Sequence, residues 1–402
     1  MKKVAIIGAG ASGIIAALKA SERNSVVLID SNDKCGKKIL LTGNGRCNYW
    51  NSEVSLEQYE TDDVDVLKSV LSEENKNNTL FFLERLGIYP KIKNGYYYPF
   101  SNQAASVREI FSKELKKRNI DFKTSNRVKD VIKQNGSFII TLDSNEQIYA
   151  DKVIIATGSK AYPKTGSDGL GYEFAKNFGH KVNDVTPALT QLIANEKFLK
   201  EWENIRCDAK VSLLVKDKCV KEDCGEIQLT SKGISGICVF NISGVASKNL
   251  ALGNKVDVMI NFLPHLENNF YSWIDDRANK MQDKTIEELL ESIFNYKLMF
   301  VLLKLANVPK DKRWSQLDEK CKKLLCSAVE NFKLHIIDTE SFDKSQVCTG
   351  GVSLREINPN NMESNIVSDL YFVGEILDVD GKCGGFNLAF AWISGYLAGR
   401  GA

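Results

Sequence analysis

Short runs of aliphatic, mostly β-branched residues occur near both ends of the chain, and each ends in small or acidic residues. The first covers residues 3–7 and leads through a glycine-rich turn into residues 12–20, whose apolar positions follow helical spacing. A second run, residues 26–29, follows soon after. Apolar runs without polar alternation are typical of strands buried on both faces of a parallel sheet. The pattern predicts a strand, a turn, a helix and a second strand, in that order.

Two later runs repeat this pattern. Residues 152–155 run into the sequence ATG at 156–158, and residues 370–373 run into GE at 374–375. In an open parallel sheet, ligands bind beyond the carboxyl ends of the strands. We therefore expect strand ends that are far apart in the sequence to converge on one ligand.

The middle of the chain has a different pattern. From 189 to 263, short apolar stretches alternate with turn residues, which predicts a small β unit. From 270 to 333 the spacing becomes helical, with an interruption at Val308-Pro309. We expect an α/β domain formed by residues 1–188 and 346–402, an inserted β unit formed by residues 189–265 and 334–345, and a helical subdomain at 266–333.

The composition is that of an ordinary globular protein and excludes several classes. The 402 residues carry 53 Lys and Arg against 51 Asp and Glu, and 43% are hydrophobic. This argues against a disordered chain and against a nucleic-acid binder recognised by overall charge. No apolar run approaches the roughly 20 residues that a membrane span needs. The ten cysteines form no CxxC pair, which fits free thiols in a reducing compartment. We therefore expect a soluble, cytoplasmic protein without a metal site.

The turn after the first strand carries a dinucleotide pattern, Gly8, Gly10 and Gly13, and Asp30 ends the second strand. In such units the first glycine permits a tight turn, the second lets a pyrophosphate approach the backbone, and the third lets the helix pack against the strand. The free N–H groups at the helix start attract the phosphate, and the acid accepts hydrogen bonds from a ribose. The alternatives are a purely structural turn and a signal peptide. Neither explains why a strand, a helix and an acid occur together at this spacing.

Two further glycine-rich segments favour a flavin over a nicotinamide. Residues 35–51 (CGKKILLTGNGRCNYWN) combine glycines with cations and amides, which suits close backbone approach and neutralisation of phosphates or of a flavin pyrimidine. The alternative is a surface loop with solvated lysines. Gly384 and Gly385 precede an apolar helical segment, and a helix start there would stabilise the negative charge of a reduced flavin.

Five segments together resemble one family. GAGASG at 8–13, KKILLTGNGRCN at 37–48, ATGSKAYPKTGSDGLGY at 156–172, TGGV at 349–352 and GEILDVDGKCGGFNLAFAWISG at 374–395 are similar to the BaiN-like (YhiN-like) FAD-dependent flavoproteins. The resemblance extends over nearly the whole chain. It implies FAD on a glutathione-reductase-like, Rossmann-type α/β fold, with an inserted β-barrel-like unit and a helical subdomain.

The resemblance also implies where the cofactor lies, with residues 374–375 at the ribityl side and residues 384–387 at the isoalloxazine. The residues expected at FAD are Gly8, Gly10, Ala11, Ser12, Gly13, Asp30, Lys37, Lys38, Gly43, Asn44, Gly45, Arg46, Cys47, Asn48, Ala156, Thr157, Gly158, Gly374, Glu375, Gly384, Gly385, Phe386 and Asn387.

One segment departs from the family pattern. GEIQLTSKGISGICVF at 225–240 has Thr230, Ser231 and Lys232 where the family commonly has a His, and Ile237 where a Pro is usual. A role for that His is therefore not transferred to this chain.

The resemblance implies a flavin-dependent oxidoreductase and leaves the substrate open, because the family includes reductases of unsaturated steroid or bile-acid intermediates and aminoacetone oxidases. We expect hydride to pass from NAD(P)H through FAD to an activated C=C bond of an apolar small molecule. The first alternative is an amine oxidase that uses dioxygen. An RNA-modifying flavoprotein is a further alternative, but the short basic runs at 310–313 and 319–323 have acidic neighbours. A non-catalytic flavin-binding module is the last.

The sequence gives few candidates for further chemistry. Only one dinucleotide pattern is present, so we expect NAD(P)H to dock transiently at the flavin. Eleven residues separate Cys35 and Cys47, whereas dithiol flavoenzymes generally have four between them, which argues against a dithiol relay. Asn94-Gly95 predicts a hairpin turn before a strand with three tyrosines. The candidate proton donors are Tyr98, Ser101, Tyr162, Lys164 and Thr349.

Overall fold

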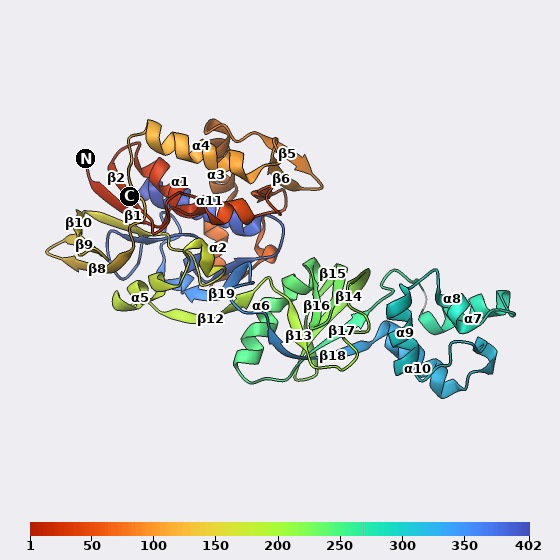
Figure 1. Cartoon of the computed structure of the whole chain (residues 1–402). Coiled ribbons are helices and arrows are strands. Elements are labelled where there is room, and N and C mark those ends of the chain that lie inside the picture. The colour runs from red at the N-terminus through yellow and green to blue at the C-terminus, as the bar shows by residue number, and fades with distance from the viewer. Residues whose placement is uncertain (268) are drawn as a thin grey trace. The chain divides into compact units, whose positions relative to one another are not determined.

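The computed structural model describes residues 1–267 and 269–402, and these form two compact units (Figure 1). One unit consists of residues 1–185 and 346–402, and the other of residues 186–345. The boundaries lie within a few residues of those expected for the α/β domain.

A five-stranded parallel sheet forms the centre of the first unit, in the order β20-β11-β1-β2-β7. Its members are β1 (Lys3–Ile7), β2 (Ser25–Ile29), β7 (Asp121–Lys123), β11 (Lys152–Ile155) and β20 (Leu370–Phe372). Except for a polar residue at the start of β1, β2 and β11, the four strands foreseen from apolar runs are buried along their length. These four predicted strands are confirmed, and their carboxyl ends share one edge because all neighbours are parallel.

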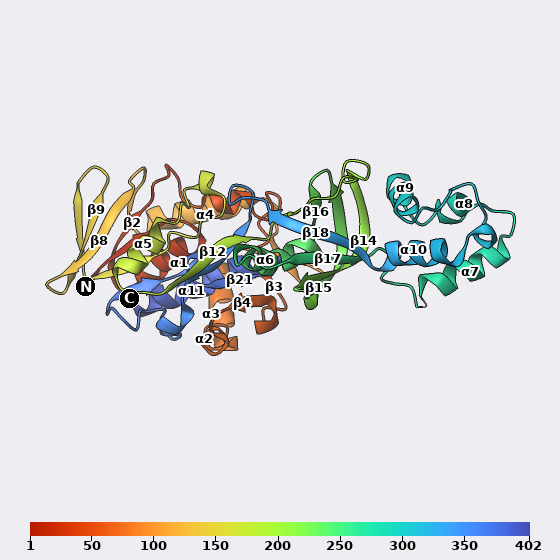
Figure 2. The same cartoon turned by 90° about the horizontal axis from the view of Figure 1, so that it is seen from below.

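Two helices pack side by side against this sheet, α1 (Ala11–Ala20) and α11 (Phe386–Gly401), as both views show (Figures 1 and 2). The contact is close because glycines line it: a Cβ at Gly395 would overlap the carbonyl oxygen of Ser12, and one at Gly399 would lie 2.6 Å from that of Ala16. Gly395 of α11 meets Ser12 of α1, and Gly399 meets Ala16, so both chains run in the same direction along the contact and the helices are parallel. Both helices therefore start at the same end of the unit.

The remaining elements of this part surround the sheet. The helices are α2 (Val64–Val70), α3 (Glu73–Arg85), α4 (Ala104–Lys117) and α5 (Leu170–Asn177), and the short 3₁₀ turns include η1 (Lys38–Leu41), η3 (Pro163–Thr165) and η6 (Gly374–Ile376). The strands are β3 (Trp50–Asn51), β4 (Tyr59–Thr61), β5 (Pro90–Lys93), β6 (Tyr96–Pro99), β8 (Val128–Gln134), β9 (Ser137–Leu142), β10 (Gln147–Ala150), β12 (Val182–Ala188), β19 (Val347–Val352) and β21 (Val379–Gly381). The predicted hairpin is confirmed: β5 and β6 pair antiparallel, and Asn94 and Gly95 between them have φ of 50° and 81°.

The second unit contains a closed six-stranded barrel, in the order β13-β16-β15-β14-β17-β18. Its strands are β13 (Leu192–Ala194), β14 (Ile205–Val215), β15 (Lys218–Thr230), β16 (Gly233–Gly236), β17 (Val256–Asn261) and β18 (Phe332–Thr339), with α6 (Ile237–Ala251) packed on them. Lys216 and Asp217 join β14 to β15 with φ of 51° and 62°, which suits a tight hairpin. The predicted barrel-like β unit is confirmed.

The described residues of the second unit also form the helices α7 (Phe270–Lys280), α8 (Ile286–Leu290), α9 (Tyr296–Leu305) and α10 (Glu319–Glu330) and the 3₁₀ turn η4 (Trp314–Gln316). Val308-Pro309 lies in the connection between α9 and α10, because proline lacks the N–H that a continuing helix needs. Among residues 1–267 and 269–402, no helix is both long and apolar enough to cross a membrane.

Candidate functional site

The three glycines of the first turn serve different purposes. A Cβ at Gly8, whose φ is 106°, would overlap the carbonyl oxygen of Ala156, and one at Gly13 would overlap that of Gly8. Close packing of the backbone therefore requires a glycine at each of these two positions. Gly10 has an ordinary φ of −80°, and no atom lies within 4 Å of the position of its missing Cβ. The chain itself does not need a glycine there, but an approaching phosphate group does.

The starts of α1 and α11 share an uncapped glycine with α6, whose N-cap is Gly236, and differ from the capped helices of the described chain. Each has a glycine as N-cap, Gly10 or Gly385, with no side-chain cap and no acid in the first turn. The capping residues that accept a backbone N–H at other helices are Asp63, Ser72, Asn269, Thr285, Asn295 and Asp318. The first N–H groups of α1 and α11 are thus left for an external anion, which the helix dipole also favours.

The parallel packing of these helices sets the length of the ligand they fit. Gly395 lies against Ser12 at the start of α1, and α11 begins nine residues earlier at Phe386. At 1.5 Å per residue the start of α11 lies roughly 13 Å beyond that of α1. The two starts suit an extended dinucleotide with its pyrophosphate at α1 and its redox ring at α11, so the residues present fit FAD.

Asp30 holds the first turn together. Its carboxylate accepts hydrogen bonds from the backbone N–H of Ala9 at 2.6 Å and from that of Asn32 at 2.7 Å. The amide of Asn32 also donates to the carbonyl of Thr165 at 2.9 Å. Asn32 was missed by sequence reasoning, although a polar residue two positions after the acid that ends a buried strand was a signal.

The loop bearing Tyr162 and Lys164 therefore lies beside Asn32, next to the acid expected at the ribose. No contact of the Tyr162 or Lys164 side chain with the flavin end of the site is seen in the described part of the chain, and both stay predicted proton donors.

Four distant segments meet between the two helix starts. Lys38 in η1 forms an ion pair with Glu375 in η6 at 2.7 Å, and the hydroxyl of Ser159 donates to the same carboxylate oxygen at 3.3 Å. Gly374 has a φ of 75° and lies so close to Ser12 that a Cβ would contact the Ser12 hydroxyl oxygen at 2.5 Å. The predicted convergence of strand ends is confirmed.

The second glycine segment forms a strained loop. Gly43, Asn44, Gly45 and Cys47 all have positive φ, between 53° and 81°. Left-handed backbone at non-glycine residues costs free energy and often marks functional sites. The loop also reaches α11, because a Cβ at Gly385 would lie 2.6 Å from the carbonyl oxygen of Trp50.

Asn48 and Asn387 position the backbone. With its amide nitrogen turned toward them, Asn48 donates to the carbonyl oxygens of Tyr97 and Trp50. The amide of Asn387 donates to the carbonyl of Gly381 at 2.7 Å and accepts from its N–H at 2.9 Å. The Asn387 side chain thus anchors β21, and its place in the first turn of α11 leaves only its backbone N–H to face a ligand.

Comparison with known proteins agrees with this geometry. The model of the family described as HI0933-like protein Rossmann domain matches residues 2–401. The chain belongs to this family. The resemblance inferred from the glycine motifs and the predicted fold class are confirmed.

Relatives of this HI0933-like chain carry two different names. It is 40% identical to a 3-dehydro-bile acid delta(4,6)-reductase of Clostridium scindens, over 100% of this chain and 99% of the relative. It is 28% identical to a ribosomal RNA dihydrouridine synthase of Escherichia coli, over 98% of this chain and 96% of the relative. Among solved structures, the open conformation of a flavocytochrome c3 fumarate reductase aligns with a TM-score of 0.50 at 14% identity, covering 99% of this chain and 77% of that one. This last likeness concerns the fold alone.

Three buried thiols of the HI0933-like chain near the site, those of Cys35, Cys47 and Cys348, are poor nucleophiles. Burial raises the pKa of Cys35 above its usual value and raises that of Cys47 to about 12. Burial likewise raises the pKa of Cys348 to about 11. A thiol of this kind stays protonated at neutral pH, whereas exchange chemistry needs the thiolate.

The other predicted proton donors differ in access. Thr349 is buried in β19, and the hydroxyl of Ser101 lies 2.7 Å from that of Ser106. Tyr98 is partly exposed on β6. The sequence did not single out Tyr172, whose hydroxyl is buried without a hydrogen-bond partner in the described chain and whose pKa burial raises well above 10. Of these groups, Ser101 is exposed and Tyr98 is partly exposed, so both are open to a ligand.

The segment that departs from the family pattern forms a turn. Thr230 ends β15, accepts a hydrogen bond from the amide of Gln191 at 2.8 Å and donates to the carbonyl of Gly233 at 3.1 Å. Ile237 begins α6 and is 60% exposed. In this HI0933-like chain, Thr230 therefore has a structural role in joining β15 to β16.

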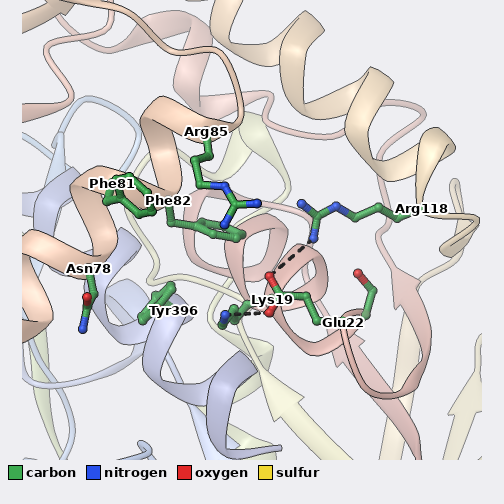
Figure 3. A pocket seen from close by; sticks show the side chains of 9 residues that line it. Lys19, Glu22, Asn78, Phe81, Phe82, Arg85, Arg118 and Tyr396 are labelled. Atoms are coloured by element: carbon green, nitrogen blue, oxygen red, sulfur yellow. Dashed lines mark hydrogen bonds and ion pairs between the residues drawn. The ribbon is translucent and has the colours of Figure 1, made fainter.

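A separate hollow of about 740 Å³ lies away from the helix starts (Figure 3). It is lined by Lys19, Ser21, Glu22, Asn78, Phe81, Phe82, Arg85, Arg118 and Tyr396. Lys19 is nine residues beyond Gly10, roughly 13 Å along α1. The hollow is therefore not part of the dinucleotide site.

Proposed function

We propose that this HI0933-like chain is an FAD-dependent oxidoreductase that reduces a C=C bond conjugated to a carbonyl in a steroid-like small molecule. The observation that carries this proposal is the 40% identity, over the full length of both chains, to a 3-dehydro-bile acid delta(4,6)-reductase. A glycine-lined site for an extended dinucleotide supports it.

Each part of the site has a task in this proposal. The start of α1 binds the pyrophosphate, and Asp30 accepts hydrogen bonds from the adenosine ribose while holding the turn. The ion pair of Lys38 with Glu375 lies at the ribityl side, and the start of α11 stabilises negative charge at the ring. Bound FAD supplies the hydride-transfer chemistry. The chain supplies orientation, electrostatics and exclusion of water.

NAD(P)H is the proposed electron donor. The chain has a single GxGxxG turn after a buried strand, so a nicotinamide would dock at the flavin face rather than in a dinucleotide domain of its own. In this arrangement NAD(P)H and the substrate would occupy the same face of the flavin one after the other.

The amine oxidase alternative lacks comparable support, because neither relative described above is named as an oxidase. The second candidate is reduction of uridine in RNA, favoured by the 28% identity to a ribosomal RNA dihydrouridine synthase. Uracil also has a C=C bond conjugated to a carbonyl, so the reaction class is the same and the substrate differs.

Charge in the helical part favours the small molecule. Residues 266–333 carry 12 Lys and Arg against 11 Asp and Glu, and several lysines are paired, including Lys280 with Asp276, Lys304 with Glu201 and Lys310 with Glu287. Binding to RNA draws on unpaired cations that neutralise phosphates. A surface whose charges are balanced and whose lysines are paired with carboxylates is poorly suited to binding RNA phosphates.

The test is turnover with a panel of acceptors. Purified, FAD-loaded protein is given NADH or NADPH with a 3-oxo-4,6-unsaturated bile acid, with its saturated counterpart, with a uridine-containing ribosomal RNA fragment, or with aminoacetone and dioxygen. We expect donor oxidation and a product two hydrogens heavier with the unsaturated bile acid. Turnover only with the RNA would favour the second candidate, and hydrogen peroxide formed from aminoacetone would favour the oxidase.

A further inference from the structure

Arg46 is a cation without a carboxylate partner at the flavin end of the candidate site. Its guanidinium carbon lies 5.1 Å from the ring centre of Tyr98, and its Nε donates to the carbonyl of Gly43 at 3.2 Å. Among the described residues no Asp or Glu forms an ion pair with it. The two terminal nitrogens of the Arg46 guanidinium group are therefore left to donate to an acceptor outside the chain.

The strand that carries Tyr98 shows which way Arg46 faces. Tyr96 and Tyr98 are two residues apart on β6, so their side chains lie on the same face of the strand. The ring of Tyr96 lies 3.1 Å from the position that a Cβ on Gly384 would take. The face that supports Arg46 is thus the face turned toward the residues just before α11.

The backbone around Arg46 is held firmly. The loop with positive φ at Gly43, Asn44, Gly45 and Cys47 encloses it, and the carbonyl of Gly45 accepts from the N–H of Ala104 at the start of α4. On the other side, the amide of Asn51 donates to the carbonyl of Gly384 at 2.9 Å. A guanidinium stacked on an aromatic ring loses little freedom when it binds, and its planar fork suits an oxygen acceptor.

We propose that the Arg46 side chain, seated on Tyr98, holds the carbonyl oxygen of the conjugated substrate. The proposal rests on the proposed function and assigns the substrate-carbonyl contact to one residue. Hydride from the reduced FAD of the proposed function adds to the β-carbon of the C=C bond, the π electron pair moves to the carbonyl oxygen, and a proton from water then adds at the α-carbon. The oxygen carries negative charge between these two events, and a fixed cation stabilises that charge.

The test compares Arg46→Met with a matched control, Arg85→Met. Arg85 is also an exposed arginine whose guanidinium lies near an aromatic ring, 5.9 Å from that of Phe81, and it lines the separate hollow (Figure 3). Arg46→Lys keeps the charge without the fork. FAD content is measured first, because Arg46 was among the residues expected at FAD, whereas this proposal assigns its side chain to the substrate and expects the variant to retain the cofactor.

Two readouts follow. The first is the rate at which the reduced protein is reoxidised anaerobically by the unsaturated ketone. The second is the affinity for 4-nitrophenolate, a planar oxyanion that resembles the substrate after hydride addition, measured by equilibrium dialysis. For Arg46→Met we expect reoxidation slower by about 100-fold and phenolate binding weaker by at least 10-fold. Arg46→Lys should recover part of both losses, while Arg85→Met should match the wild type.

The outcomes separate this proposal from the proposed function. If the unsaturated ketone does not reoxidise even the wild-type protein, the proposed function fails, and the phenolate titration still tests the anion site at Arg46. Wild-type reoxidation and phenolate binding in Arg46→Met would overturn the assignment. Loss of FAD from that variant would also overturn it, because the side chain would then serve the cofactor.

Discussion

Gly10→Asp should separate folding from cofactor binding. Gly10 has φ of −80° and ψ of −167°, which is the extended conformation of an N-cap residue, and no atom lies within 4 Å of its missing Cβ. An aspartate therefore fits without strain. Its carboxylate would accept the free N–H groups of the first turn of α1 and complement the helix dipole.

The two effects of this substitution have opposite signs. The added cap and the charge at the helix start should stabilise the FAD-free protein by about 0.5–1 kcal/mol. The same carboxylate stands where the pyrophosphate would bind. Two like charges about 4 Å apart repel by about 4 kcal/mol at an effective dielectric constant of 20, which corresponds to FAD affinity weaker by about 1000-fold.

The assay is thermal unfolding of the FAD-free protein together with titration by FAD, followed by quenching of flavin fluorescence. Gly10→Ser supplies a neutral cap of similar shape and should retain far more affinity than Gly10→Asp. Gly13→Ala should instead disrupt the unit, because its Cβ overlaps the carbonyl oxygen of Gly8. Wild-type FAD affinity in a folded Gly10→Asp protein would refute the placement of the pyrophosphate at α1.

Four further predictions follow from the site and its surroundings. Asp30→Ala should weaken FAD retention by about 1.5–3 kcal/mol, measured by dialysis, because a charged hydrogen-bond acceptor is lost; full retention would remove Asp30 from the site. Replacing Cys35 and Cys47 together by Ser should leave flavin reduction and reoxidation within a few-fold in stopped-flow traces, since both thiols have raised pKa values; loss of reoxidation with FAD still bound would favour a dithiol relay. Burial lowers the pKa of His180 below 6.5, so the neutral form is favoured in the folded state and stability should fall as the pH drops through and below 6.5; a His180→Gln protein should show a flatter dependence of its melting temperature on pH. Asn387→Asp should lower stability by about 1–3 kcal/mol, because a carboxylate oxygen would face the carbonyl that the amide now contacts in β21; an unchanged melting temperature would contradict that anchoring role.

Local pattern was enough to predict the elements that carry the cofactor site. The strands before Gly8 and Asp30 are apolar runs without alternation, and the GxGxxG spacing and the paired glycines at 384–385 mark helix starts. These features depend on neighbours within a few residues. The sequence therefore predicted the fold class and the convergence of strand ends.

Features that depend on contacts between residues far apart in the sequence could not be predicted from local pattern. The parallel packing of α1 on α11 rests on Gly395 and Gly399, which meet residues more than 380 positions earlier. The amide of Asn387 could have faced a ligand, and only the course of β21 gives it a partner. The position of Tyr162 beside Asn32 likewise follows from a hydrogen bond across the sheet edge. No local spacing encodes such contacts.

A single-turnover measurement tests the central claim most directly. FAD-loaded protein is reduced anaerobically with the nicotinamide donor, freed of excess donor, and mixed with a 3-oxo-4,6-unsaturated bile acid. The account predicts that the oxidised flavin absorbance returns in step with the loss of the conjugated ketone, and that the product carries the added hydrogen at the β-carbon of the former double bond. A flavin that stays reduced with this ketone but is reoxidised at once by dioxygen or by the uridine-containing RNA fragment would contradict the account.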